Sequence, residues 1–97
     1  MKTYKITRVD DVVHLFCNGV EMLPESGIFD CGCGSAGALN LAKVIIADCM
    51  GKWESSKHFL ELKWYIVNPA PREGFEITDD KVRYLCEEWN KESFKKA

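Results

Sequence analysis

A glycine-rich turn that runs directly into a strongly apolar stretch constrains this chain more than any other feature. The turn spans residues 29–37 and reads Phe-Asp-Cys-Gly-Cys-Gly-Ser-Ala-Gly, and the apolar stretch covers residues 38–50. Glycine costs backbone entropy, so a fold keeps it where φ is positive or where another group approaches the backbone. A helix that begins at such a turn points unpaired N–H groups and the positive end of its dipole outward. This arrangement favours the binding of an anion or of a polar partner.

Length and composition are those of one small globular domain. The 97 residues predict a single domain, 1–97, and the 46% apolar content is ordinary for a packed core. No apolar run approaches the roughly 20 residues that span a bilayer, and no hydrophobic signal region follows the N-terminus. We therefore expect a cytoplasmic protein with no membrane partner.

The charge balance and the cysteines narrow the function classes further. Lys and Arg total 13 and Asp and Glu total 15, so the chain lacks the excess of cations that neutralises nucleic-acid phosphates. General nucleic-acid binding is therefore disfavoured. The five cysteines form an odd set without a secretion signal, which predicts reduced thiols.

The N-terminal third predicts antiparallel strands. Residues 2–9 alternate between the two faces of a strand, and a second strand is predicted over 12–17. Asn18-Gly19 lies between two apolar runs and is a strong hairpin signal. Short strands are also expected at 27–31 and 73–77.

The remainder predicts helices. The first covers about 38–50 and ends at Gly51 as a left-handed cap. The second runs from an N-cap at Ser55 or Ser56 to about Val67, and the third begins after the N-cap Thr78. We expect an α+β fold in which an N-terminal antiparallel β-hairpin or three-stranded sheet packs against about three helices.

At the glycine turn the chain resembles a family of short phage and prophage proteins of unassigned function. In that family an aromatic-acidic pair leads into an aromatic, glycine-rich turn, and a Pro or small residue opens a Leu/Ala-rich helix. The matching residues are Phe29, Asp30, Gly32, Gly34, Gly37, Leu41, Ala42 and Ile45, and a later helix with Phe59 and Lys63 and a stripe ending at Trp89 fit the layout. Cys31 and Cys33 stand where the family usually has Trp and Tyr. The resemblance implies a phage or prophage origin, a host-cell cytoplasmic location and an anti-defence role, but no reaction.

The leading hypothesis is a non-enzymatic protein that sequesters a nucleotide-like or other anionic ligand at the turn and the helix N-terminus. The residues expected to bind it are Gly32, Gly34, Ser35, Gly37, Asn40 and Lys43. Backbone N–H groups, the serine hydroxyl and the lysine ammonium would supply donors and charge. The turn is not a P-loop, because the Gly-Lys-Ser/Thr ending is absent. The alternative is that the glycines only allow a strand and a helix to pack closely.

Other interpretations compete with ligand binding. Trp64 and Tyr65 are candidates for a surface that docks a host defence protein, since exposed rings mark partner sites. Cys31 and Cys33 with further Cys or His residues suggest a small zinc-binding module, although the usual two-residue spacer is missing. No cofactor is expected, and no nucleophile with a nearby base indicates an enzyme. A homo-oligomer that shares a pocket between copies would suit either binding role.

Overall fold

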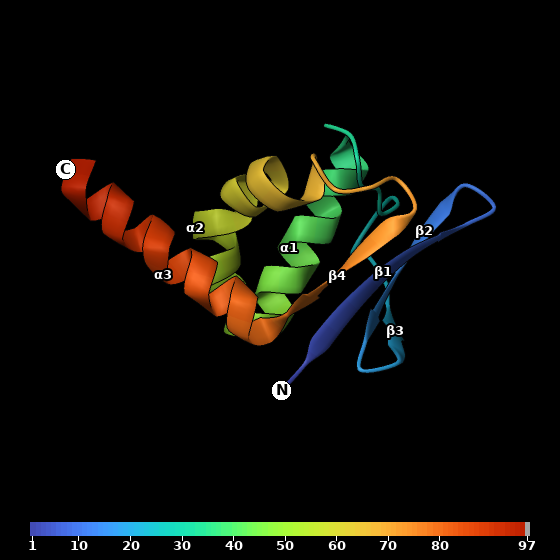
Figure 1. The fold of residues 1–97 in the computed structure, drawn as a ribbon, viewed down its shortest axis with the longest axis horizontal. Coiled ribbons are helices and arrows are strands. Elements are labelled where there is room, and N and C mark those ends of the chain that lie inside the picture. Colours follow the sequence, from blue (N-terminus) through green and yellow to red (C-terminus); the bar gives the residue numbers. More distant parts are fainter. Residues whose placement is uncertain (97) are drawn as a thin grey trace.

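A four-stranded antiparallel sheet forms one layer of the fold, with the strand order β3-β2-β1-β4 (Figure 1). The computed structural model describes the backbone of residues 1–96 and the side chains of residues 1–52 and 57–91. The strands are β1 (Thr3–Val9), β2 (Val12–Cys17), β3 (Val20–Met22) and β4 (Gly74–Thr78). β4 returns from a distant part of the chain to pair with β1, which makes β1 a central strand.

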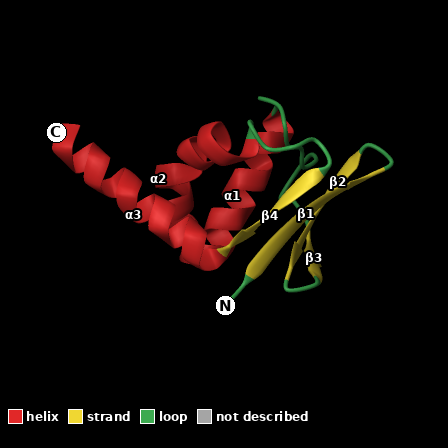
Figure 2. Cartoon of the chain, in the orientation of Figure 1, coloured by secondary structure: helices red, strands yellow, loops and turns green. Residues whose placement is uncertain are grey.

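Helices cover one face of the sheet and form the second layer (Figure 2). They are α1 (Ala36–Met50), α2 (Lys52–Leu62), the π-helix η1 (Lys63–Val67) and α3 (Asp79–Lys96). α1 packs against α2 and η1, and α3 leads away from the sheet toward the C-terminus (Figure 1). This arrangement confirms the predicted α+β class. None of the helices in the described part of the chain is long and apolar enough to cross a bilayer.

The core lies between the sheet and α1. Alternate strand residues point toward the helices, and the middle of α1 is enclosed on most sides, as expected for a helix with so narrow a polar face. The buried apolar side chains of the strands and α1 are Tyr4, Ile6, Val13, Leu15, Ile77, Ala38, Leu41, Ala42, Ile45 and Ile46.

The predicted hairpin turn and the predicted N-cap of α3 are confirmed, whereas Gly51 ends α1 with φ 96° and ψ 165°, which is not the predicted left-handed cap. Asn18 and Gly19 both have positive φ, 49° and 85°, as a tight hairpin turn requires. The Thr78 hydroxyl accepts a hydrogen bond from the Lys81 N–H at 3.2 Å, so Thr78 caps α3.

Three element boundaries differ from the prediction. The short strand expected at 27–31 is reduced to a single bridge between Val13 and Phe29. α2 begins at Lys52 instead of Ser55 or Ser56, because the backbone turns at Gly51, where φ is 96°, and enters the next helix at once. The stretch 63–67 remains helical as predicted, but it widens into a π-helix.

Candidate functional site

The glycine loop, residues 30–37, is held by the carboxylate of Asp30. Its Oδ1 accepts hydrogen bonds from Arg8 Nη2 at 2.7 Å and from the Cys31 N–H at 2.9 Å. Its Oδ2 accepts a hydrogen bond from the Ser35 hydroxyl at 3.3 Å. Burial opposes ionisation of Asp30, but these bonds hold the pKa of its carboxyl below the ordinary value of 3.8. The loop therefore carries its own anion.

The N-terminus of α1 is engaged by the chain's own acceptors. Ser35 is the N-cap, and its carbonyl and hydroxyl oxygens accept from the Ala38 N–H at 3.1 and 3.4 Å. A Cβ at Gly37 would lie 2.8 Å from Asp30 Cβ, so the glycine allows the start of α1 to approach the backbone of residues 29–30 closely. Ser35 and Gly37 thus form the base of the loop, beneath its tip.

The other two glycines of the predicted site have different surroundings. The Gly32 N–H donates to the Val67 carbonyl at 3.0 Å, and a Cβ there would lie 2.9 Å from the Ala70 carbonyl oxygen. Gly32 therefore joins the loop to the segment after η1. A Cβ at Gly34 would lie 3.7 Å from Asn68 Nδ2 and 4.0 Å from Lys63 Nζ. At Gly34 the loop faces two nitrogen donors.

Lys63 and Asn68 reach Gly34 from the π-helix. The Asn68 N–H donates to the Lys63 carbonyl at 2.8 Å, the wide turn that defines η1. Lys63 is 8% exposed, and its Nζ lies 4.6 Å from the centroid of the Trp64 ring. Among the described residues, the ammonium has neither a hydrogen-bond acceptor nor a carboxylate partner. Asn68 Oδ1 is also buried and without a partner in the described part of the chain.

The predicted residues Asn40 and Lys43 face a different segment. Asn40 Nδ2 donates to the carbonyls of Ser26 and Ile28, at 3.2 and 3.0 Å, and so holds the segment before the loop. Lys43 Nζ lies 4.9 Å from the centroid of the Phe59 ring. Both residues line a groove of about 600 Å³ on the exposed side of α1. The structure therefore divides the predicted site between the loop and this groove.

The two residues predicted to form a partner surface are exposed. Trp64 is 63% exposed and Tyr65 is 66% exposed. Trp64 contacts the Lys63 ammonium, whereas the Tyr65 ring lies 6.1 Å from that of Trp89 on α3. Only Trp64 is thus linked to the glycine loop, through Lys63.

The two neighbouring cysteines of the loop, Cys31 and Cys33, have different surroundings. Cys31 is buried, and its thiol contacts the Pro71 carbonyl at 3.5 Å. The Cys33 thiol donates to the Ser35 hydroxyl at 3.2 Å. Across the side chains that the structure describes, no group of three or more His, Cys, Asp or Glu residues could hold a metal ion.

The two histidines contact residues outside the loop. His14 Nδ1 lies 2.7 Å from Glu21 Oε2. The buried His58 lies 2.6 Å from Glu61 Oε1 and 2.8 Å from Asn90 Oδ1. Each imidazole therefore has a polar partner within the fold.

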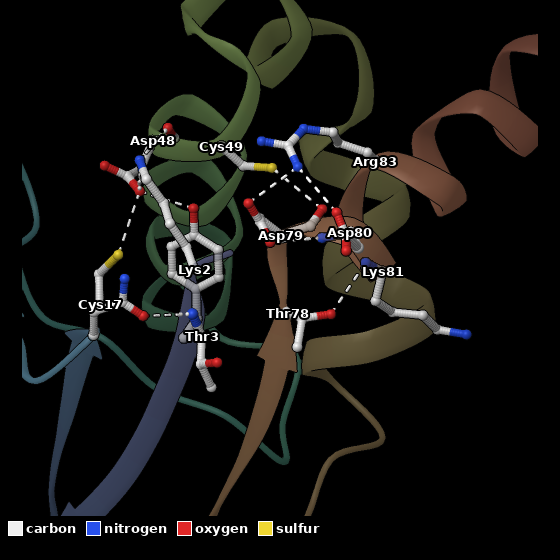
Figure 3. Close-up of polar contacts among 12 residues, drawn as sticks. Lys2, Thr3, Cys17, Asp48, Cys49, Thr78, Asp79, Asp80, Lys81 and Arg83 are labelled. Atoms are coloured by element: carbon white, nitrogen blue, oxygen red, sulfur yellow. Dashed lines mark hydrogen bonds and ion pairs between the residues drawn. The ribbon is translucent and has the colours of Figure 1, made fainter.

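A second polar cluster joins the opposite end of α1 to the sheet and to α3 (Figure 3). Asp48 accepts hydrogen bonds from Lys2 Nζ at 3.1 Å and from the Tyr4 hydroxyl at 2.8 Å. Burial opposes ionisation, but these bonds hold the Asp48 pKa below its ordinary value of 3.8. Asp79, at the start of α3, bonds Arg83 Nη1 at 3.0 Å and also has a lowered pKa. This cluster holds the end of α1 against the start of β1 and the start of α3.

These carboxylates make the fold sensitive to acid. Their pKa values in the folded chain lie below the unfolded value, so their stabilisation is fully present above about pH 5 and is lost as the pH falls below about 4. We expect the urea midpoint to fall steeply below about pH 4. Asp48→Asn should lower the midpoint at pH 7 and flatten the acid decline. An unchanged acid slope in that variant would contradict the assignment.

Sequence reasoning missed Lys63 and Asn68 as site residues. Lys63 was named only as a residue that, with Phe59, fits the layout of the phage protein family. One signal was present: Lys63 lies four residues after Phe59 and three before Ile66, on the apolar side of the predicted helix. A cation at such a position needs a partner from elsewhere in the fold or from a ligand.

Comparison with models of protein families, with curated proteins and with solved structures found no match to this chain.

Proposed function

We propose that the protein binds a small anionic ligand without transforming it, at the tip of the glycine loop where Lys63 and Asn68 face Gly34. The observation that carries the proposal is the largely buried Lys63 side chain, whose ammonium no acceptor in the described part of the chain neutralises. The proposed ligand is still an anion, as predicted from the sequence, but the lysine proposed to bind it is Lys63 instead of Lys43.

A cation on a largely buried side chain favours an anionic partner for a simple physical reason. Removing a charge from water costs several kcal/mol unless another charge or good hydrogen bonds replace the lost solvent. The Trp64 ring offsets part of this cost, since a cation over an aromatic face gains about 0.5–2 kcal/mol. An anionic ligand would offset the rest of the free-energy cost of removing the Lys63 charge from water.

Neighbouring donors favour the same kind of ligand. Asn68 Nδ2 faces Gly34 beside the ammonium, and in the described part of the chain no acceptor takes the backbone N–H of Cys33 or Gly34. Successive free N–H groups beside a cation form a typical oxyanion site. Arg72 also lies beside the loop, since its Cγ would be 3.0 Å from a Cβ at Gly32.

Lys63→Met should weaken the binding of inorganic phosphate at least tenfold at low salt. A hydrogen bond to a charged group contributes about 1.5–3 kcal/mol, and methionine preserves the apolar stem while removing the charge. Titration followed by amide chemical shifts measures both the affinity and the position of the site. The matched control is Lys81→Met, because Lys81 makes the same kind of ring contact, 5.6 Å from the Tyr84 centroid.

Two further variants distinguish the loop tip at Gly34 from the groove on α1 as the phosphate site. Gly34→Ala places a methyl group between the two nitrogens at ordinary contact distances, so it should block phosphate while the fold is retained. Lys43→Met tests the cation chosen from the sequence. If Lys43→Met abolishes binding and Lys63→Met leaves it intact, the site is the groove on α1. If the natural chain binds no phosphate, the proposed function is wrong.

Sequestration is the form of binding that the phage resemblance suggests. It requires a stoichiometric complex from which the ligand is recovered chemically unchanged. Incubation followed by mass analysis of the released ligand tests this point, and any turnover would contradict a non-enzymatic role.

Docking of a protein partner is the second candidate. It is favoured by the exposure of Leu60, Trp64 and Tyr65, which are 51%, 63% and 66% exposed on consecutive turns of one helical segment. A docking role predicts that Leu60→Ser and Tyr65→Ser abolish capture of a host protein. Anion binding at Lys63 predicts no effect of either change on phosphate affinity.

A further inference from the structure

We infer that the ligand is a nucleoside phosphate, with its phosphoryl group on Lys63 and the Gly34 amide and its base stacked on Trp64. This inference rests on the proposed function and names the substrate class of the same site.

The state of the Trp64 side chain is the first observation. Its large apolar ring is 63% exposed, although it directly follows a residue that is 8% exposed. An exposed indole is a platform for a flat π-system on the face that the Lys63 ammonium does not cover, and any nucleobase has a suitable face. The exposed ring therefore offers a contact that inorganic phosphate cannot use.

The position of the cation is the second observation. Lys63 Nζ lies 4.6 Å from the Trp64 ring centroid, so an anion held by the ammonium lies beside the ring. A ligand that satisfies both features must join an anionic group to a planar group through a short linker. A nucleoside monophosphate has this arrangement.

The unpartnered Asn68 oxygen is the third observation. Asn68 Nδ2 faces Gly34, and Oδ1 of the same amide is buried with no donor in the described part of the chain. Phosphate and carboxylate groups offer acceptors to this site, whereas Oδ1 needs an N–H or O–H donor. Because Oδ1 is enclosed by the chain, the Asn68 atom that faces the loop tip is Nδ2, a donor suited to a phosphoryl oxygen.

The experiment compares adenosine 5′-monophosphate with inorganic phosphate on the natural chain and on Trp64→Leu. We expect the natural chain to bind the nucleotide about tenfold more tightly than phosphate, the effect of one stacked base. Trp64→Leu should make the nucleotide and phosphate bind with equal affinity, whatever change in phosphate affinity itself follows from losing the ring beside Lys63, and Trp64→Phe should restore most of the difference. The matched control is Tyr65→Leu, a ring of similar exposure that lies against Trp89, which should change neither affinity.

Each outcome separates the inference from the function on which it rests. If phosphate binds and the nucleotide binds no more tightly, or if Trp64→Leu weakens both ligands equally, the base does not stack on Trp64 and the inference is overturned. The anion site would survive that result. If neither ligand binds, the proposed function fails and the inference fails with it.

Discussion

The Gly74→Ala variant is expected to lose most of its free energy of unfolding at 25 °C. Gly74 opens β4 with a φ of 128°, and a Cβ there would collide with the carbonyl of Ile6, whose carbon would be 2.8 Å away. The obstacle is backbone of the central strand β1, so no side-chain rotation relieves it. The combined strain and clash should cost about 4 kcal/mol or more, most of the stability of a small domain. Urea denaturation followed by circular dichroism measures the loss.

Gly19→Ala separates the strain from the clash. Gly19 also has a positive φ, 85°, but nothing lies within 4 Å of a Cβ there. This variant should lose only about 1–2 kcal/mol, the cost of a left-handed conformation for an ordinary residue. Equal losses in the two variants would show that contact with Ile6 has no part in the effect.

Local patterns predicted most of the fold. The hairpin depends on Asn18-Gly19, whose positive φ values are a property of the two residues themselves. The start of α3 depends on the Thr78 hydroxyl, which caps the helix three residues away. The enclosed middle of α1 follows from its narrow polar face. In each case the cause lies within a few residues of the effect.

The candidate site could be predicted only in part, because it is assembled from distant segments. Gly34 was among the predicted binding residues, but its neighbours Lys63 and Asn68 come from a π-helix and its end, which no helical periodicity distinguishes from an α-helix. Lys43 was chosen because it follows the turn in sequence. The direction of its side chain along α1, toward Phe59, depends on packing that only the structure shows.

The same assembly explains how the loop keeps its shape. The Arg8 guanidinium, on β1, bonds the Asp30 carboxylate at 2.7 Å and the Arg72 carbonyl at 2.6 Å. One side chain thus joins the sheet, the glycine loop and the segment before β4. Arg8 and Asp30 are 14% and 25% exposed, so this ion pair is partly shielded from solvent. The loop geometry near Gly34 should therefore depend on Asp30.

Asp30→Ala is expected to lower the free energy of unfolding by about 2–3 kcal/mol, because it leaves the shielded Arg8 guanidinium without its carboxylate and removes the acceptor of Ser35. Asp80→Ala is the matched control. That carboxylate is 74% exposed and lies 3.4 Å from Arg83, so its loss should cost about 0.5 kcal/mol. Thermal or urea unfolding of both variants measures the difference.

Phosphate titration of Asp30→Ala then distinguishes two roles for this carboxylate. If Asp30 is the support that orders the loop, its removal should weaken phosphate binding at least tenfold, although the variant carries one negative charge fewer. If Asp30 is instead an internal anion that competes for the loop, its removal should tighten binding, and that result would contradict the support role. Asp30 lies at the base of the loop with Ser35, whereas Lys63 lies at the tip by Gly34, and this separation favours the first outcome.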